Sequence, residues 1–474
     1  MNTMTIIPTL LFAVPLALTS TSCWSEEDDE DAESAHESET VLTLSYESHR
    51  HALSADDAED LVSPAFTAEL EFRRSYRVSQ VLVGLVDIDL ISEQQKFEGD
   101  LQSDVDNRAV LEEYWLQWSG NTDTNTSLRI GRQNITDDEG WWWDEELDAV
   151  TLRGHTERSF HMVGLGRSSD APRSNPAPRD PELDSIYWLF GHLRIRPSEW
   201  TQWDVHLTAR QDRSSRHQPA RHQTSVNADS SDDGLAWIGL QLRQAHVTNR
   251  GHRFELQSRG AWMGGTLRTQ AVEDDDSPDV ESPDSDNTDD DDQENQPDVA
   301  PVDSVSANAW AFSVWLHWTP QQLSNHTLSL GYSIGSGTDL GQAEGSGTFR
   351  QTGLHSNEID HHYYGEVLDP ELSNLRIATI QLRGHIFGST RYALTHHRYS
   401  RDSLHDDTLE AEIDLDLNTG DRRLGHETRL SLEFEPIDGL QTELSIARLI
   451  TGELMDSGQR ESIDRIAVEL TYEF

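Results

Sequence analysis

The 474-residue chain contains one lysine, Lys96, and one cysteine, Cys23, and it has no long apolar run beyond its first residues. A single cysteine excludes an intramolecular disulfide. Because no stretch of ~18 consecutive apolar residues follows the N-terminal region, a helical membrane protein is excluded. The formal net charge of -50 disfavours nucleic acid and anionic lipid surfaces as partners, since like charges repel.

Much of the negative charge lies in two tracts. Residues 26–39 contain nine acidic residues, and residues 273–298 contain 14 without a compensating basic residue. Such segments are typically solvated and disordered, because they offer little apolar surface to bury. We therefore expect an acidic linker over 23–39 and disorder at 273–299, inside a longer acidic loop insertion, 264–306. The ordered spacing of a dedicated calcium loop is missing, so we expect no cofactor beyond a loose Ca²⁺ association with these acidic loops.

The N-terminal segment predicts export from the cytoplasm. Residues 1–22 contain an apolar stretch, Ile6–Leu18, followed by the small residues Ser20 and Ser22, which is the pattern of a signal peptide. Cys23 directly follows, and two interpretations stay open for it: a degenerate lipidation site or an unmodified thiol beside the cleavage point.

The remaining chain alternates apolar and polar residues with a period of two, which predicts strands that have one apolar face. In the last segment, the even positions from Ile466 to Phe474 are apolar, while the odd positions are polar or small. The same alternation runs from Trp310 to Trp318, whose two tryptophans suit membrane interfaces. We therefore expect Phe474 at the end of a barrel strand, facing outward.

The predicted strands number 18, and the connections between them alternate between short and long. They span 40–48, 65–73, 78–90, 108–118, 126–132, 147–154, 157–165, 184–196, 201–210, 234–246, 251–263, 307–318, 326–335, 373–383, 390–399, 424–435, 440–450 and 463–474. Short turns at one rim and long loops at the other are typical of an antiparallel transmembrane barrel with both termini on the periplasmic side. The predicted fold is all-β: a closed antiparallel transmembrane β-barrel of about 18 strands over 40–474.

Several motifs resemble, in the right order, the outer-membrane alginate export porin family. They are Gly131–Gln133 (GRQ), Trp141–Asp144 (WWWD), Leu147–Val150 (LDAV), Phe349–Gly353 (FRQTG), Tyr364–Leu375 (YGEVLDPELSNL) and His397–Tyr399 (HRY). The resemblance implies an outer-membrane location, alginate as the transported polymer, and periplasmic polysaccharide synthesis or secretion proteins as further partners. It also implies coverage of the pore by loops from both sides. The predicted strands, however, leave no long periplasmic turn.

Arginines recur on the face opposite the apolar residues, so they would line the lumen of a barrel. The predicted substrate-binding, pore-lining set is Arg73, Arg129, Arg153, Arg194, Arg210, Arg243, Arg259, Arg350, Arg429 and Arg465. Arginine is always charged and binds carboxylates through a planar fork, which suits passage of a carboxylate-rich polymer. Acidic residues fall on the same face, so many arginines would be neutralised across the wall: Glu69, Glu71, Asp87, Asp89, Glu113, Glu255, Glu427, Glu433, Glu469 and Glu473.

The remaining motifs give weak evidence for other chemistry. The Trp141–Trp143 loop fits an interface anchor at the outer rim better than a platform on which sugars stack. The neighbouring acids, Asp144 to Asp148, resemble other acidic clusters of the chain and therefore do not indicate a general acid–base pair. The histidine pairs His361–His362 and His396–His397 cannot chelate as units, because adjacent strand residues point to opposite faces. We expect no metal site and no catalytic residues.

Three functions remain open at this stage. The preferred one is an outer-membrane porin that exports an anionic exopolysaccharide, with alginate implied by the resemblance, by passive transport through an arginine-lined pore. The second is a general anion or nutrient porin. The third is an outer-membrane polysaccharide-modifying enzyme. No HExxH or P-loop motif occurs, which favours the porins over the enzyme.

Overall fold

The structure is a computed structural model. It describes residues 38–52, 62–95, 104–120, 125–137, 141–169, 172, 174, 186–213, 234–270, 302–343, 345–351, 364–387, 389–406, 409, 411, 422–452 and 462–474. The signal peptide expected at 1–22 and the disordered tract expected at 273–299 lie outside these residues. No helix in this part of the chain has the length and apolar character needed to cross a bilayer.

Nineteen strand segments and one short 3-10 helix make up the described secondary structure. They are β1 (Ser38–Ala52), β2 (Val62–Ser79), β3 (Leu82–Gln95), β4 (Asp104–Val110), β5 (Tyr114–Ser119), β6 (Thr126–Thr136), β7 (Asp144–His155), β8 (Ser159–Ser168), β9 (Tyr187–Ser198), β10 (Thr201–Gln211), β11 (Gly234–Val247), β12 (Arg253–Gln270), β13 (Val302–Thr319), η3 (Gln321–Leu323), β14 (His326–Gly335), β15 (Leu375–His385), β16 (Arg391–Arg401), β17 (Arg423–Ile437), β18 (Leu440–Thr451) and β19 (Ser462–Glu473).

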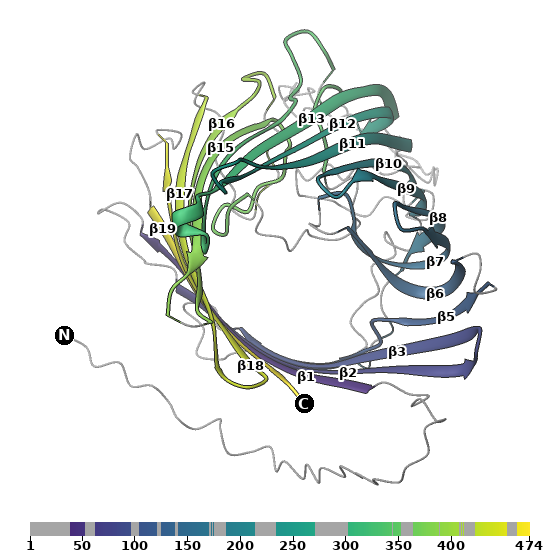
Figure 1. Cartoon of the computed structure of the whole chain (residues 1–474). Coiled ribbons are helices and arrows are strands. Elements are labelled where there is room, and N and C mark those ends of the chain that lie inside the picture. Colours follow the sequence, from purple (N-terminus) through teal and green to yellow (C-terminus); the bar gives the residue numbers. More distant parts are fainter. Residues whose placement is uncertain are drawn as a thin grey trace, which may run out of the picture. The chain divides into compact units, whose positions relative to one another are not determined.

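Except for β4 and β5, each strand pairs antiparallel with its neighbours in the sequence, and β1 also pairs with β19. The sheet is thereby closed into a ring around a lumen (Figure 1). Both β4 and β5 pair with β3, so they occupy one position in the ring, interrupted at residues 111–113. At the interruption Asp87 N donates to Glu113 O, and Glu112 N donates to Asp87 O. The predicted closed barrel of 18 strands is confirmed.

Side chains alternate between the two faces of the wall, as the sequence predicted. Leu116 and Ile130 are directly opposite each other on β5 and β6, and both are exposed on the outside. Phe474 is also exposed, and its ring packs edge-on against Tyr472 with centroids 4.6 Å apart. Outward-facing apolar residues form a continuous band because every strand presents alternate positions to the same side.

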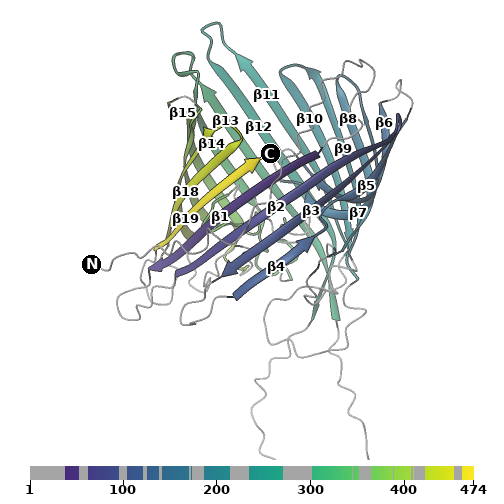
Figure 2. The same ribbon diagram turned by 90° about the horizontal axis from the view of Figure 1, so that it is seen from below.

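The connections separate into two rims, again as predicted. The long ones follow β1, β3, β6, β8, β10, β12, β14, β16 and β18. Short turns follow the intervening strands, and the turn joining β11 to β12 lies at the upper rim in Figure 2. A long connection follows the end of β1, so the start of β1 lies at the short-turn rim. The end of β19 lies beside it, because Phe474 N donates to Thr40 O at 3.0 Å. The described residues therefore contain no long turn on that side.

The outward and inward faces differ in their tolerance for charge. We expect Ile380→Arg to destabilise the barrel by up to about 2–4 kcal/mol, because Ile380 lies on the exposed apolar face of β15. Equilibrium unfolding by denaturant in lipid vesicles measures this. Gln381→Arg is the matched control, since the neighbouring residue points to the other face, where its amide donates to Thr395 Oγ1. Equal losses in the two variants would contradict the assignment of faces.

Candidate functional site

The tryptophan loop between β6 and β7 turns into the barrel. Trp141, Trp142 and Trp143 are 0, 0 and 3% exposed. Trp143 Nε1 donates to Thr208 Oγ1 on β10 at 2.9 Å, and the Trp142 ring stacks on His206 of the same strand with centroids 4.6 Å apart. The interpretation of these residues as an interface anchor at the outer rim is therefore wrong. Their faces pack against protein, so they offer no open sugar-stacking platform either.

Two local features direct the loop inward. The Asp137 carboxylate accepts the backbone N–H groups of Trp141 and Trp142 at 2.9 and 3.2 Å, which holds the turn together. Gly239 on β11 leaves space for the second indole: a Cβ atom built there would lie 1.5 Å from Trp142 Cη2. Neither feature shows in the alternation pattern, which is why the sequence favoured the interface for these tryptophans.

The tryptophan loop joins the loop that connects β14 to β15. Trp141 Nε1 donates to the Tyr364 hydroxyl at 2.8 Å, and the Tyr399 hydroxyl of β16 donates to Tyr364 O at 2.7 Å. Gln351 adds a second link, because its Nε2 donates to Trp141 O at 3.3 Å while its Oε1 accepts Leu372 N at 3.2 Å. The tryptophan loop leads into β7, which is nine strand positions from β16 in the closed ring, so this chain of contacts crosses the lumen (Figure 1). We call it the transverse loop bridge.

Glu427 on β17 anchors the far end of the transverse loop bridge. Its carboxylate accepts the backbone N–H groups of Glu366, Val367 and Leu368 at 2.6, 3.3 and 3.1 Å, and the Tyr399 hydroxyl at 3.3 Å. The sequence placed this acid on the lumen face as a partner for arginine. In the structure the Glu427 carboxylate accepts backbone amides instead, so it holds the loop, and none of these contacts involves an arginine.

A third loop, which follows β16, packs against the same assembly. The Asp406 carboxylate accepts Thr338 N at 2.7 Å and also accepts the Thr348 hydroxyl. Ser403 Oγ donates to Thr338 O at 2.6 Å, and Asn374 Nδ2 donates to Asp406 O at 2.8 Å. These buried polar groups satisfy one another and join the loop after β16 to the loop between β14 and β15.

Among the residues that the structure describes, six of the ten predicted pore arginines are seen paired with carboxylates. The pairs are Arg73 with Glu71, Asp87 and Glu113, Arg194 with Asp204, Arg210 with Asp212, Arg243 with Glu255, Arg429 with Glu366 and Glu443, and Arg465 with Glu47. The expectation that acids neutralise many of these arginines holds for this group. Arg259 is buried in β12, and Arg350 lies in the loop after β14 and not on a strand; both make contacts inside the barrel.

Arg129 and Arg153 differ from these six. Arg129 donates through Nε and Nη2 to Gln117 Oε1 at 3.1 and 2.9 Å, and its Cζ lies 3.8 Å from the centre of the Trp115 ring. Arg153 Nη2 donates to Gln133 Oε1 at 3.3 Å. Among the residues that the structure describes, neither guanidinium has a carboxylate within 4.0 Å.

The two arginines share one face of neighbouring strands. Arg129 is opposite Thr151 in the β6–β7 register, so Arg153 is its diagonal neighbour. The nearest acid in this region, Glu113, is occupied: its Oε2 accepts Arg73 Nη2 at 3.0 Å and its Oε1 accepts Asn134 N at 2.6 Å. The two guanidinium groups therefore occupy neighbouring positions on the lumen wall, near Glu113 and facing away from the exposed apolar side of β6.

The other candidate residues have structural partners. Glu146 pairs with Arg132 at 2.7 Å, and Asp148 accepts Ser169 Oγ at 2.6 Å, so this acidic cluster serves packing. His396 and His397 point to opposite faces as expected, since the first is half-exposed and the second is 3% exposed. The pair His361–His362 lies outside the described residues.

Comparisons with known proteins agree with this geometry. The family described as Alginate export matches residues 43–469. The alginate production protein AlgE of Pseudomonas aeruginosa is 24% identical over 341 residues, which cover 67% of this chain and 62% of that protein. AlgE of Pseudomonas syringae pv. tomato is 25% identical over 163 residues, which are 33% of this chain and 32% of that protein. The matched part thus spans less than two thirds of either relative.

Solved structures share the fold. Pseudomonas aeruginosa OccD3 superposes with a TM-score of 0.52 at 11% identity, over 92% of this chain and 91% of that one. Acinetobacter baumannii OccAB1 also has a TM-score of 0.52 at 11% identity, over 92% and 97% of the two chains. At this identity the likeness concerns the barrel alone.

The transverse loop bridge should depend on the space at Gly239. We expect Gly239→Ala to displace Trp142 and raise the ion conductance of the barrel in planar bilayers, because the added Cβ overlaps the indole. Gly260→Ala on β12 is the control, since a Cβ there meets no atom nearer than 3.8 Å. If folded Gly239→Ala barrels conduct like the wild type, the tryptophan loop does not narrow the lumen.

The anchor at Glu427 gives a separate prediction. Glu427→Gln replaces an acceptor of three backbone N–H groups with an amide, which weakens the attachment of residues 364–374 by about 1–3 kcal/mol. We expect faster proteolysis within that segment while the barrel stays folded. Glu443→Gln makes the same chemical change at a half-exposed partner of Arg429 and should leave the cleavage rate unchanged. Identical cleavage in both variants would show that Glu427 does not hold the loop.

Proposed function

Because the chain belongs to the alginate export family, we propose that this outer-membrane barrel exports alginate, an anionic polysaccharide, by passive transport. The observation that carries the proposal is the pair Arg129 and Arg153. Two half-buried cations without a carboxylate within ion-pair distance among the described residues, set in a lumen wall, attract a polyanion that brings its own carboxylates.

The paired arginines extend the path along the wall. Arg73 and Arg429 are about half or more buried and hold carboxylates in the lumen, so an arriving uronate can compete for the same guanidinium groups. Exchange of one carboxylate for another costs little, and several weak sites in series permit both entry and release. The transverse loop bridge leaves less of the cross-section open, which brings the chain of sugars close to this wall.

Two features support the proposed direction and partners. The long connections leave the strands at one rim and the short turns join them at the other, so the short-turn rim is accessible to periplasmic polysaccharide synthesis or secretion proteins. The apolar band on the outside contacts the lipid of the outer membrane. We propose no catalytic step, because the acids nearest the arginine pair are engaged in ion pairs and hydrogen bonds.

A general anion porin is the second candidate. The same arginine pair would bind small anions, and polymer block separates the two functions. In planar bilayers, alginate should block the halide current of the exporter at concentrations where monomeric uronate does not, because a polymer contacts several arginines at once.

Replacing both arginines tests the proposal. Each contact to a uronate is worth on the order of 1 kcal/mol in a partly hydrated channel. We expect Arg129→Glu with Arg153→Glu to weaken alginate block by about tenfold or more, at ~1.4 kcal/mol per decade, and to lower anion selectivity. Arg448→Glu is the control, since Arg448 is exposed and paired with Asp464 at 2.5 Å. Unchanged block in folded double-mutant barrels would remove this pair from the path and move the constriction to Arg350, Arg429 or Arg465.

A further inference from the structure

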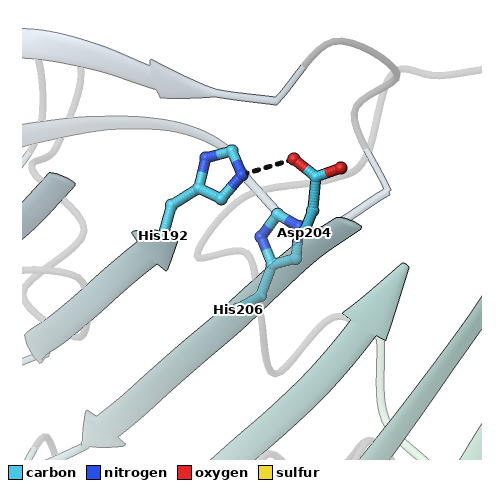
Figure 3. Close-up of side chains that lie close together, drawn as sticks. All are labelled: His192, Asp204 and His206. Atoms are coloured by element: carbon cyan, nitrogen blue, oxygen red, sulfur yellow. Dashed lines mark hydrogen bonds and ion pairs between the residues drawn. The ribbon is translucent and has the colours of Figure 1, made fainter. Parts of the chain in front are cut away.

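We propose that His192, Asp204 and His206 form a binding site for a divalent transition-metal ion of the Zn²⁺ class. The three residues lie on the neighbouring strands β9 and β10 and are 8, 1 and 2% exposed. Their ligand atoms all lie within 4.8 Å of one another. Figure 3 shows the three side chains close together on the two strands, with His192 linked to Asp204.

The strand register explains why these residues meet. His206 is directly opposite His192, and Asp204 precedes His206 by two residues, so all three point to the same face. Adjacent histidines in the sequence gave no reason to expect a metal site, because they point to opposite faces of a strand. His192 and His206 are separated by the turn at residues 199–200, and only the pairing of the two strands brings them together.

The imidazole of His206 has no hydrogen-bond partner among the described residues. Both of its ring nitrogens are buried. Leaving such a buried group unsatisfied costs about 1–3 kcal/mol. A metal ion would accept the lone pair of one nitrogen, and it would explain why an imidazole occupies a place between the rings of Trp142 and His192.

The donor set indicates the class of metal. Two imidazoles and one carboxylate match the borderline-soft ions Zn²⁺, Ni²⁺ and Cu²⁺, whereas Ca²⁺ and Mg²⁺ prefer sites made of oxygen alone. Three protein ligands leave one coordination position for water. The site also includes outer contacts that orient its carboxylate, because Gln202 Nε2 donates to Asp204 Oδ2 at 2.8 Å.

Arg194 competes with the metal. Its Nε donates to Asp204 Oδ1 at 2.6 Å, and His192 Nε2 approaches the same oxygen at 2.8 Å. The two imidazoles stack with centroids 4.4 Å apart and planes 18° apart, so their nitrogens do not yet converge. Binding therefore requires the rings to tilt and Arg194 to release Oδ1, which makes Arg194 an antagonist of the site through both position and charge.

Occupancy would act on the transverse loop bridge. His206 stacks on Trp142, and Trp143 packs edge-on against both His192 and His206. An ion that fixes the two imidazoles would fix the surface on which the tryptophan loop rests. The site thus links a metal to the part of the barrel interior that narrows the lumen.

Zn²⁺ titration of the full-length folded protein in detergent tests the proposal. Calorimetry is run with excess Mg²⁺, which occupies exposed carboxylates and leaves imidazole sites free. We expect a saturable Zn²⁺ site in the wild type, with affinity lowered about tenfold or more by His206→Gln or Asp204→Asn. Arg194→Gln should raise the affinity, because it removes a competing cation.

His161→Ala is the matched control, since His161 is an exposed histidine on the neighbouring strand β8. The Zn²⁺ affinity of the His161→Ala variant should equal that of the wild type. Absence of a saturable site in the wild type, or equal affinity in His206→Gln and His161→Ala, would overturn the proposal. If the ligand variants fail to fold, the comparison of wild type with Arg194→Gln decides: weaker or unchanged Zn²⁺ binding in Arg194→Gln contradicts the site.

Discussion

The pairing of β1 with β19 is the contact on which the whole structure depends. It runs from Val41 opposite Glu473 to Ala52 opposite Ser462 and closes the ring of backbone hydrogen bonds. In a bilayer an open strand edge would leave amides without partners, at a cost of several kcal/mol each. Closure also fixes two environments, lipid outside and water or protein inside. Every alternate side chain must suit one of them, which is why the lumen wall is the place for arginines.

Most of the barrel could be predicted from the sequence, because its signal is local. Alternation with a period of two depends only on which face each residue meets, and loop lengths report the two rims directly. The interruption between β4 and β5 could not be predicted in this way. It depends on contacts with other segments, such as Leu111 N, which donates to Pro172 O at 3.0 Å.

The candidate site could be predicted only in part. Alternation places Arg129 and Arg153 on the inner face, but it does not reveal which arginines are neutralised. Arg73 donates to Glu113, which is 40 residues away in the sequence, and this contact engages the carboxylate that lies near Arg129 and Arg153. The prediction for the tryptophan loop was wrong for a related reason. Tryptophan suits both a membrane interface and a packed interior, and only the cavity beside Gly239 selects the interior.

The transverse loop bridge implies an order of assembly. Trp141 and Tyr364 are 223 residues apart in sequence, and the anchor Glu427 comes later still. Contacts of such long range form late in folding, because the intervening chain must first be ordered. Strands β6 to β14 can therefore pair while their interior is still unobstructed. The lumen becomes narrow only when the last third of the chain has joined the wall. A barrel that lacked these last contacts would therefore have a wider and less selective lumen.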